Sequence, residues 1–202
     1  MQNKIVTIFC LFGILLMLSS CATKKMFSSK YYYHNEKALT DIEQSYKSLN
    51  DQKPFSIGFT DKSFHYISLE IITDTIKYIY EFEVTEPRLQ DTLHKYQLPI
   101  QGIIELVKKM QLLQCIWINK LNYYDNNQKR SLIFMSIRKA VFQLPFTTEK
   151  YYILTFYPQP QYYDSVGNLL SKRQLQKIRK INGDTFRRIN DKVAYTVSNK
   201  FR

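Results

Sequence analysis

Hydrophobic positions in the first part of the chain change between the period of a helix and the period of a strand. From Glu36 to Leu49, apolar residues recur at steps of three and four, which predicts an amphipathic helix. From His65 to Ile71 and again from Ile76 to Val84, apolar and polar residues alternate, which predicts a hairpin. Lys77 and Glu81 fall on the polar side of the second strand, so we expect one buried face and one solvated face.

The middle of the chain repeats this change of period. Pro99 begins a second apolar stripe at helical spacing, which runs to Leu113 and predicts a core helix. Two apolar segments, 116–124 and 131–138, flank a turn-rich tetrapeptide and predict a second hairpin. A further strand is expected over residues 150–157.

The last part of the chain begins with a helix start signal. Ser171 and Gln174 have the spacing of a capping box, in which each side chain bonds to the backbone N–H of the other residue. We therefore predict a third helix that ends near Gly183, followed by short strands over 185–189 and 193–197. Residues 36–202 should form one α+β domain, in which a curved antiparallel sheet of several hairpins carries about three helices on one face.

The N-terminus has a different pattern from the rest of the chain. Lys4 precedes an apolar run from Ile5 to Leu18, and two small residues, Ser19 and Ser20, follow it. A helix that crosses a bilayer needs roughly 20 apolar residues, and this run is shorter. The pattern is typical of a cleaved signal peptide, which we place at residues 1–20.

The segment Leu18–Cys21, with the sequence Leu-Ser-Ser-Cys, resembles the lipobox of bacterial lipoprotein signal peptides. The resemblance implies that cleavage precedes Cys21, that its sulfur carries a diacylglycerol, and that its new amine is a site for a further acyl chain such as palmitate. Each buried methylene contributes about 0.8 kcal/mol, so two or three chains would hold the protein on a membrane. The alternative is ordinary secretory cleavage after Ala22, which would release a soluble protein.

The resemblance also implies where the protein resides. A lipidated cysteine places it in the bacterial cell envelope, and Ala22 after that cysteine resembles outer-membrane sorting in some bacteria. We therefore expect an outer-membrane anchor rather than a cytoplasmic-membrane anchor, with the domain facing the periplasm or the exterior. Residues 21–35 would be the lipidated cysteine and a flexible tether. The rings of Tyr31–Tyr33 would settle either at the membrane interface or against the domain.

Motifs that carry chemistry are scarce. Once Cys10 leaves with the signal and Cys21 is lipidated, Cys115 has no partner for an intramolecular disulfide and is expected to lie in the core. The three histidines lack the paired spacing of metal ligands. The few glycines form neither a phosphate-binding loop nor a dinucleotide fingerprint. The sequence therefore predicts no catalytic residue, no metal and no cofactor.

Charge is the clearest signal in the composition. The chain has 29 Lys and Arg against 17 Asp and Glu, a net charge of +12, and loss of Lys4 with the signal leaves +11. In an envelope protein this excess favours anionic lipid, lipopolysaccharide or acidic glycan over nucleic acid. The alternative is that the excess only solvates the surface. The candidate anion-binding residues are Lys172, Arg173, Lys177, Arg179, Lys180, Arg187 and Arg188.

A loop stiffened by prolines, residues 156–164, carries several aromatic rings. Its candidate contact residues for a sugar ring or a protein edge are Tyr157, Tyr162 and Tyr163. The alternative is an aromatic plug over the edge of the core. A concave groove that holds these tyrosines beside Asp164 or Asn168 would favour glycan binding.

These observations predict a membrane-anchored, non-enzymatic binding or assembly component of the envelope. It would engage anionic lipid, glycan or another envelope protein through a basic C-terminal face. Two alternatives belong to other classes. An envelope hydrolase would need His65 or His94 to converge with an acid and a hydroxyl in a deep cleft. A carbohydrate-binding module would need the Tyr157–Tyr163 loop to be exposed.

Overall fold

The computed structural model describes residues 29–125, 128–138, 150–172 and 174–199. The predicted signal peptide, the lipidation site Cys21 and Arg173 lie outside these ranges. The chain divides into two compact units, Met1–Glu36 and Lys37–Arg202, and the second unit contains the sheet.

The first helix covers residues 29–52 and confirms the helix predicted over 36–49. It begins earlier than expected, so residues 29–35 of the predicted tether are helical. Tyr32, which is only 3% exposed, lies seven positions before Leu39, so the apolar spacing of the helix extends toward the N-terminus. In the second unit, Leu39 and Tyr46 of this helix are fully buried, as their spacing predicts.

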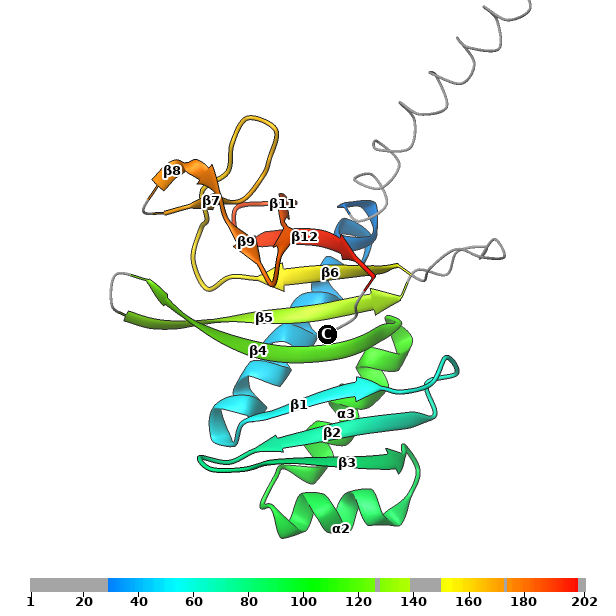
Figure 1. The fold of residues 1–202 in the computed structure, drawn as a ribbon. Helices are drawn as coiled ribbons and strands as arrows, with labels where there is room; N and C mark the ends of the chain where they lie inside the picture. Colours follow the sequence, from blue (N-terminus) through cyan, green and yellow to red (C-terminus); the bar gives the residue numbers. More distant parts are fainter. Residues whose placement is uncertain (1–28, 126–127, 139–149, 173, 200–202) are drawn as a thin grey trace, which may run out of the picture. The chain divides into compact units, whose positions relative to one another are not determined.

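The main sheet is antiparallel and has eight strands in the order β11-β12-β6-β5-β4-β1-β2-β3 (Figure 1). Its strands are β1 (Phe55–Phe59), β2 (Tyr66–Ile72), β3 (Lys77–Glu83), β4 (Cys115–Asp125), β5 (Gln128–Arg138), β6 (Tyr151–Phe156), β11 (Arg187–Arg188) and β12 (Val193–Ser198). The sheet is curved and does not close on itself, which confirms the predicted α+β class. The predicted hairpins are β2-β3 and β4-β5.

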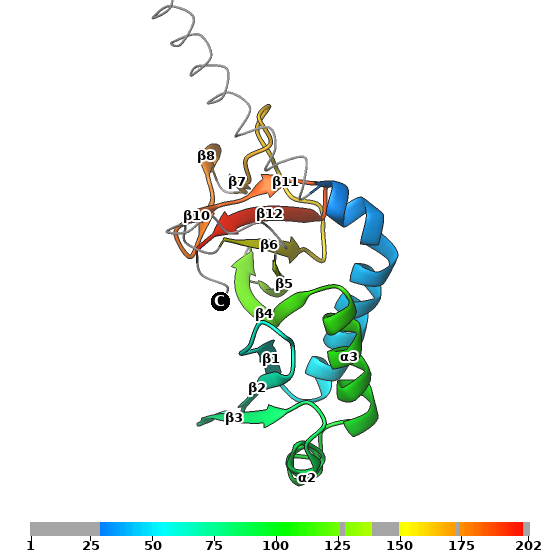
Figure 2. The same cartoon turned by 90° about the vertical axis from the view of Figure 1, so that its right-hand side faces the viewer.

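Three helices occur within the described residues, but one of them is not where the sequence pattern placed it. Residues 37–52 of the first helix and α3 (Ile100–Leu112) pack on one face of the sheet, as predicted (Figure 2). The other helix is α2 (Pro87–Lys95), which lies beside β3 at the end of the sheet (Figures 1 and 2). Only Leu89 and Leu93 of α2 are buried, and so short a stripe is a weak sequence signal.

The third helix predicted from Ser171 to Gly183 is wrong. This segment instead forms two small sheets, which pair β7 (Leu170–Ser171) with β8 (Gln174–Ile178) and β9 (Lys180–Ile181) with β10 (Asp184–Thr185). All five residues of β8 are exposed, so this segment buries no apolar stripe of the kind that stabilises a helix in a protein. Asn182 and Gly183 have φ angles of 52° and 85°, which suit the two-residue turn of the β9-β10 hairpin rather than a helix stop.

The main sheet carries a hydrophobic core on each of its two faces. The first core lies under the helices, where Ile57, Leu69 and Ile118 are fully buried. On the opposite face, the chain that follows β6 packs back onto the strands and encloses what we call the second core. Its buried members are Leu132, Phe134, Ile153, Tyr157, Leu169, Ile181, Phe186 and Ala194. Residues 132–137 of β5 are all buried because both faces of that strand are covered.

Candidate functional site

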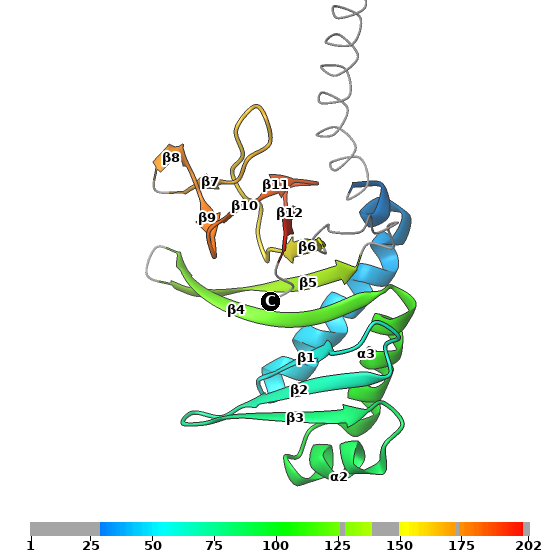
Figure 3. The same cartoon turned by 45° about the vertical axis from the view of Figure 1, so that its right-hand side comes forward.

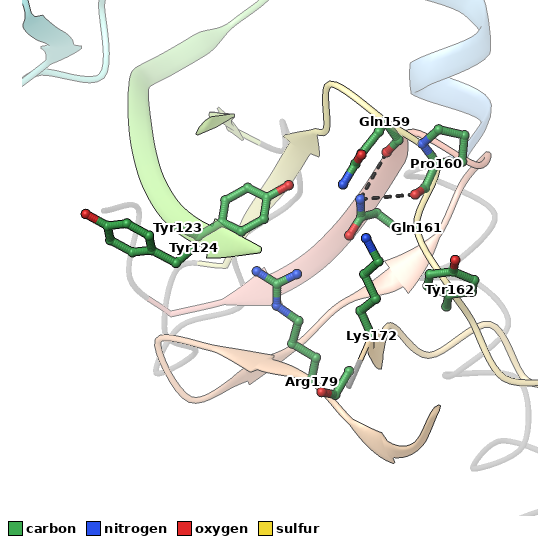
Figure 4. A pocket seen from close by; sticks show the side chains of 9 residues that line it. Tyr123, Tyr124, Gln159, Pro160, Gln161, Tyr162, Lys172 and Arg179 are labelled. Atoms are coloured by element: carbon green, nitrogen blue, oxygen red, sulfur yellow. Dashed lines mark hydrogen bonds between the residues drawn. The ribbon is translucent and has the colours of Figure 1, made fainter. Parts of the chain in front are cut away.

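A groove of about 590 Å³ lies beside the second core (Figure 4). Three segments that are distant in sequence form it: the end of β4, the loop after β6, and the region of β7 and β8. The β4-β5 hairpin curves, and the end where its turn lies extends below β7 and β8 (Figures 1 and 3). The residues that line the groove are Tyr123, Tyr124, Gln159, Pro160, Gln161, Tyr162, Ser171, Lys172 and Arg179.

Backbone hydrogen bonds hold the loop side of the groove in place. The N–H of Tyr157 donates to the carbonyl of Lys192 at 2.8 Å, and the N–H of Gln161 donates to that of Asp191 at 2.9 Å. The N–H of Leu170 donates to the carbonyl of Tyr162 at 2.8 Å. The loop is thus fixed at both ends, and its prolines restrict it further. A ligand would meet a groove that is largely formed beforehand.

Arg179 places its guanidinium in the groove, toward the ring of Tyr123 (Figure 4). The guanidinium carbon lies 4.9 Å from the centre of that ring, which is the range of a cation–π contact. The backbone N–H of Arg179 donates to the carbonyl of Leu169 at 2.8 Å and fixes the base of the side chain. Within the residues that the structure describes, no carboxylate pairs with Arg179. Its hydrogen-bond donors are therefore available to an anion.

The three predicted contact tyrosines have different environments. Tyr162 is 49% exposed and lines the groove. Tyr157 is 4% exposed and belongs to the second core, so it is the aromatic plug of the alternative interpretation. Burial raises the pKa of Tyr157, against the opposing charge of Arg179. Tyr163 packs against the second core, its ring lies 5.7 Å from the Arg188 guanidinium carbon, and burial raises its pKa to about 12.

Asp164 and Asn168 do not line the groove. The backbone N–H of Asn168 donates to Oδ1 of Asp164 at 2.7 Å, and its side-chain amide donates to Oδ2 at 2.8 Å. These hydrogen bonds lower the pKa of Asp164. The two residues therefore stabilise their own loop, and the polar side chains that lie near Tyr162 in the groove are glutamines instead.

The predicted basic residues are likewise divided. Lys172 and Arg179 line the groove, whereas Lys177 and Lys180 are exposed outside its lining. Arg187 and Arg188 form β11, also outside the lining. Arg188 pairs with Asp191 at 2.5 Å. Of the predicted basic residues that the structure describes, the groove therefore includes Lys172 and Arg179.

Sequence reasoning missed Tyr123, Tyr124 and the two glutamines of the groove. A signal for the tyrosines was present, because neighbouring residues on a strand point to opposite faces. If one of two adjacent tyrosines at the end of a strand packs on the core, the other must therefore point away from the core. Tyr124 is indeed 74% exposed, while Tyr123 packs against the second core.

The residues named for a hydrolase do not form a cleft. His65 and His94 are exposed, and neither lines the groove. No group of three or more His, Cys, Asp or Glu within the described ranges is arranged to hold a metal ion. Cys115 is fully buried, which confirms it as a core residue and raises its pKa to about 12.

Comparisons with protein-family models, with curated proteins and with solved structures found no match. Among the described helices, none has the length and apolar character needed to cross a bilayer. The geometry of the groove is therefore the basis for a functional proposal.

Proposed function

We propose that this protein is a lipid-anchored binding component of the cell envelope and that its groove binds an acidic glycan. The observation that carries the proposal is the placement of Arg179, which lies against the Tyr123 ring in a groove fixed by backbone hydrogen bonds and has no carboxylate partner among the described residues. The anchor is the lipid on Cys21 that the lipobox resemblance implies. It would keep the groove within reach of the surface on which the ligand lies.

The chemistry of the lining suits a sugar that carries a negative group. Tyrosine rings offer flat apolar faces for the C–H faces of a sugar, together with polar tips. Gln161 and Ser171 supply amide and hydroxyl groups for sugar hydroxyls. Arg179 presents a planar set of donors that matches a carboxylate or a phosphate group. The volume of about 590 Å³ lies within the usual range for ligand sites.

The lining also favours binding over catalysis. Among the described residues it contains no Asp, Glu, His or Cys, so it lacks the carboxyl, imidazole and thiol groups that often act as general acid, general base or nucleophile. Glycoside hydrolysis usually needs two carboxyl groups on either side of the bond that breaks. A groove without carboxylates holds such a substrate and leaves it intact. The net charge of +12 would raise the rate at which anionic ligands arrive.

The test is a comparison of matched charged and neutral oligosaccharides. We expect a glucuronic acid oligomer to bind measurably in isothermal titration calorimetry and a glucose oligomer of equal length to bind at least tenfold more weakly. Arg179→Ala should weaken binding of the acidic oligomer by about 10-fold to 100-fold, since a charged hydrogen bond contributes about 1.5 to 3 kcal/mol. Lys177→Ala is the matched control, because Lys177 is exposed outside the groove and its loss also removes one positive charge.

Equal affinities for the acidic and neutral oligomers would contradict specific binding in the groove. Equal losses of affinity in Arg179→Ala and Lys177→Ala would contradict it as well. A double variant with Arg187→Ser and Arg188→Ser separates the groove from a general basic surface. If binding of anionic phosphatidylglycerol vesicles falls in this variant while Arg179→Ala leaves it unchanged, the basic face predicted from the sequence is the anion site. The proposed groove function would then be wrong.

A further inference from the structure

A second cavity, of about 250 Å³, lies between the main sheet and the β9-β10 hairpin. Trp117 of β4 and Phe134 of β5 line it from the sheet, and Phe186 lines it from the chain just after β10. Phe134 and Phe186 are 5% and 2% exposed, so this wall belongs to the second core. None of these residues takes part in the groove described above.

The β9-β10 hairpin carries two polar side chains to this aromatic cavity. Ile181 pairs with Asp184 across the hairpin, and its side chain is 8% exposed within the second core. That burial holds the hairpin on the sheet. Asn182 in the turn and Asp184 directly after it both line the cavity. Burial of Ile181 in the second core therefore positions Asn182 and Asp184 against the aromatic side of the cavity.

Asp184 has no charge partner in the part of the chain that the structure describes. Neither its carboxylate nor the amide of Asn182 makes a hydrogen bond or an ion pair there. Other carboxylates of the described chain do form ion pairs with a lysine or an arginine: Asp41, Asp51, Glu70, Glu86 and Asp191. A carboxylate left without a cation beside three aromatic rings is a set of groups that attracts a positive ligand.

We propose that this cavity binds a small organic cation, an ammonium group with apolar substituents. The electron-rich faces of aromatic rings attract such a cation, and the Asp184 carboxylate supplies the opposite charge. At about 30 Å³ per water molecule, the cavity has room for roughly eight non-hydrogen atoms, the size of choline. The amide oxygen of Asn182 is an acceptor for a hydroxyl or N–H on the ligand.

Two other occupants fit the lining less well. An uncharged apolar ligand would displace water from the Asp184 carboxylate without supplying a hydrogen bond or an opposite charge, which is unfavourable. A bare metal ion would find one carboxylate and one amide, whereas Ca²⁺ takes six to eight oxygen ligands and Zn²⁺ usually takes at least three protein ligands. The ammonium group uses both the aromatic wall and the carboxylate.

Trp117 makes the cavity directly observable, because it is the one tryptophan in the whole sequence. We would titrate the protein with choline and follow tryptophan fluorescence at constant ionic strength. The comparison ligand is 3,3-dimethyl-1-butanol, which has the shape of choline with a neutral carbon in place of the charged nitrogen. We expect a saturable change with choline and at least tenfold weaker binding of the neutral analogue.

Asp184→Asn keeps the shape of the side chain and removes its charge. It should weaken choline binding about tenfold and leave binding of the neutral analogue unchanged. The matched control is Asp91→Asn, an exposed change on α2 that also removes one negative charge and should alter neither affinity. No saturable response to choline, equal affinity for the two ligands, or equal effects of the two variants would overturn the proposal. Circular dichroism and thermal unfolding establish that each variant is folded.

Vesicle binding distinguishes two sources of the ammonium group, a lipid head group and a soluble compound. If phosphatidylcholine vesicles change the tryptophan fluorescence, phosphatidylglycerol vesicles do not, and free choline competes, the ligand is a lipid head group. If free choline binds and neither type of vesicle has an effect, the ligand is a soluble ammonium compound. Arg179→Ala should leave choline binding unchanged, so failure of the glycan proposal does not affect this one.

Discussion

The two halves of the main sheet differ in how many of their side chains are buried. In β5 and β6, consecutive residues are buried because helices cover one face and the second core covers the other. In β3, only Phe82 is buried, and Ile79 is 59% exposed. We call the first region, with β4 and β12, the covered half, and β1, β2 and β3 the open half. Both the groove and the cavity lie in the covered half.

On the face of the open half that points away from the helices, β1, β2 and β3 carry small side chains and one ion pair with a hydrogen-bonded serine. Ser56 donates to Oε2 of Glu70 at 2.8 Å, and Nζ of Lys77 lies 2.7 Å from the same oxygen. Gly58 leaves space beside Trp117. Ser56 and Ser68 are buried on this face, whereas Ile79 of β3 is exposed. The chain after β6 lines both the groove and the cavity, so these two hollows depend on that segment as well as on the sheet.

Two leucines that are each 0% exposed provide the strongest test of this difference, Leu69 in the open half and Leu169 in the second core. Replacing either with Ala should lower the free energy of unfolding by about 2 to 5 kcal/mol, because each change leaves a cavity. Hydrogen exchange should separate them. Leu69→Ala should raise exchange throughout the sheet, whereas Leu169→Ala should raise it mainly in residues 157–190. The same exchange pattern in both variants would contradict two distinct cores.

Gly58→Ala tests the boundary between the two halves. A Cβ at this position would lie 2.9 Å from Cδ1 of Trp117 and 3.1 Å from the carbonyl oxygen of Ile116, which is closer than van der Waals contact. We expect a loss of about 1 to 3 kcal/mol in unfolding free energy and a shift in tryptophan fluorescence. The control is Gly102→Ala, where the nearest atom is the end of the flexible Leu49 side chain, at 2.8 Å. Equal losses without a shift in fluorescence would show that the indole does not fill this space.

Tyr46→Phe tests the polar link between the first helix and β1 in the open half. The Tyr46 hydroxyl donates to the carbonyl of Phe55 at 2.6 Å and accepts from the Asn50 amide at 3.0 Å, both in buried surroundings. Loss of the hydroxyl should lower the free energy of unfolding by about 1 kcal/mol. The effect is modest because the Asn50 amide still donates to the carbonyl of Phe55 at 2.7 Å, so that carbonyl keeps a partner. Urea unfolding measures the change. Tyr124→Phe, at an exposed ring, should have no effect; a comparable loss there would show that the hydroxyl bonds of Tyr46 are not the cause.

Asp61 gives the smallest effect, which depends on pH. Partial burial acts to raise its pKa, but hydrogen bonds from the Ser63 hydroxyl and from the backbone N–H groups of Tyr66, His65 and Ser63 outweigh it and lower the pKa to about 2. A carboxyl with a lowered pKa stabilises the fold above its ordinary pKa near 4 and loses that contribution as the pH falls toward 2. Asp61→Asn should therefore reduce the melting temperature slightly at pH 7 and flatten its decline between pH 4 and pH 2. The exposed Asp74→Asn is the control, and an unchanged decline in Asp61→Asn would contradict the assignment.

The sequence allowed the elements with complete apolar patterns to be predicted. The first helix and α3 were predicted because each has a long apolar stripe. The β2-β3 hairpin was predicted because its strands alternate, and the β4-β5 hairpin because two apolar segments flank a turn-rich tetrapeptide. Local signals were less reliable. The capping box at Ser171 is compatible with a helix but does not create an apolar face. The Asn182-Gly183 pair marks a hairpin turn as readily as a helix end, and the structure has the hairpin.

The groove was predicted only in part. Tyr162, Lys172 and Arg179 were named from composition, but their meeting with Tyr123 depends on how the chain after β6 folds back on the sheet. That contact joins residues that are far apart in sequence, and no periodic pattern encodes it. The sequence left Tyr157 open between a contact residue and an aromatic plug, because alternation along a strand does not reveal whether a second layer will cover the outward face; the side chain is buried in the second core.

The ends of the main sheet are blunted in two different ways. The outermost strand on one side, β11, has two residues, and on the other side α2 runs beside β3, where the Tyr80 and Tyr96 hydroxyls lie 2.6 Å apart. A short or shielded margin offers little backbone to a neighbouring strand. If the lipid anchor concentrates many copies on one surface, such margins would keep them from polymerising into a continuous ribbon.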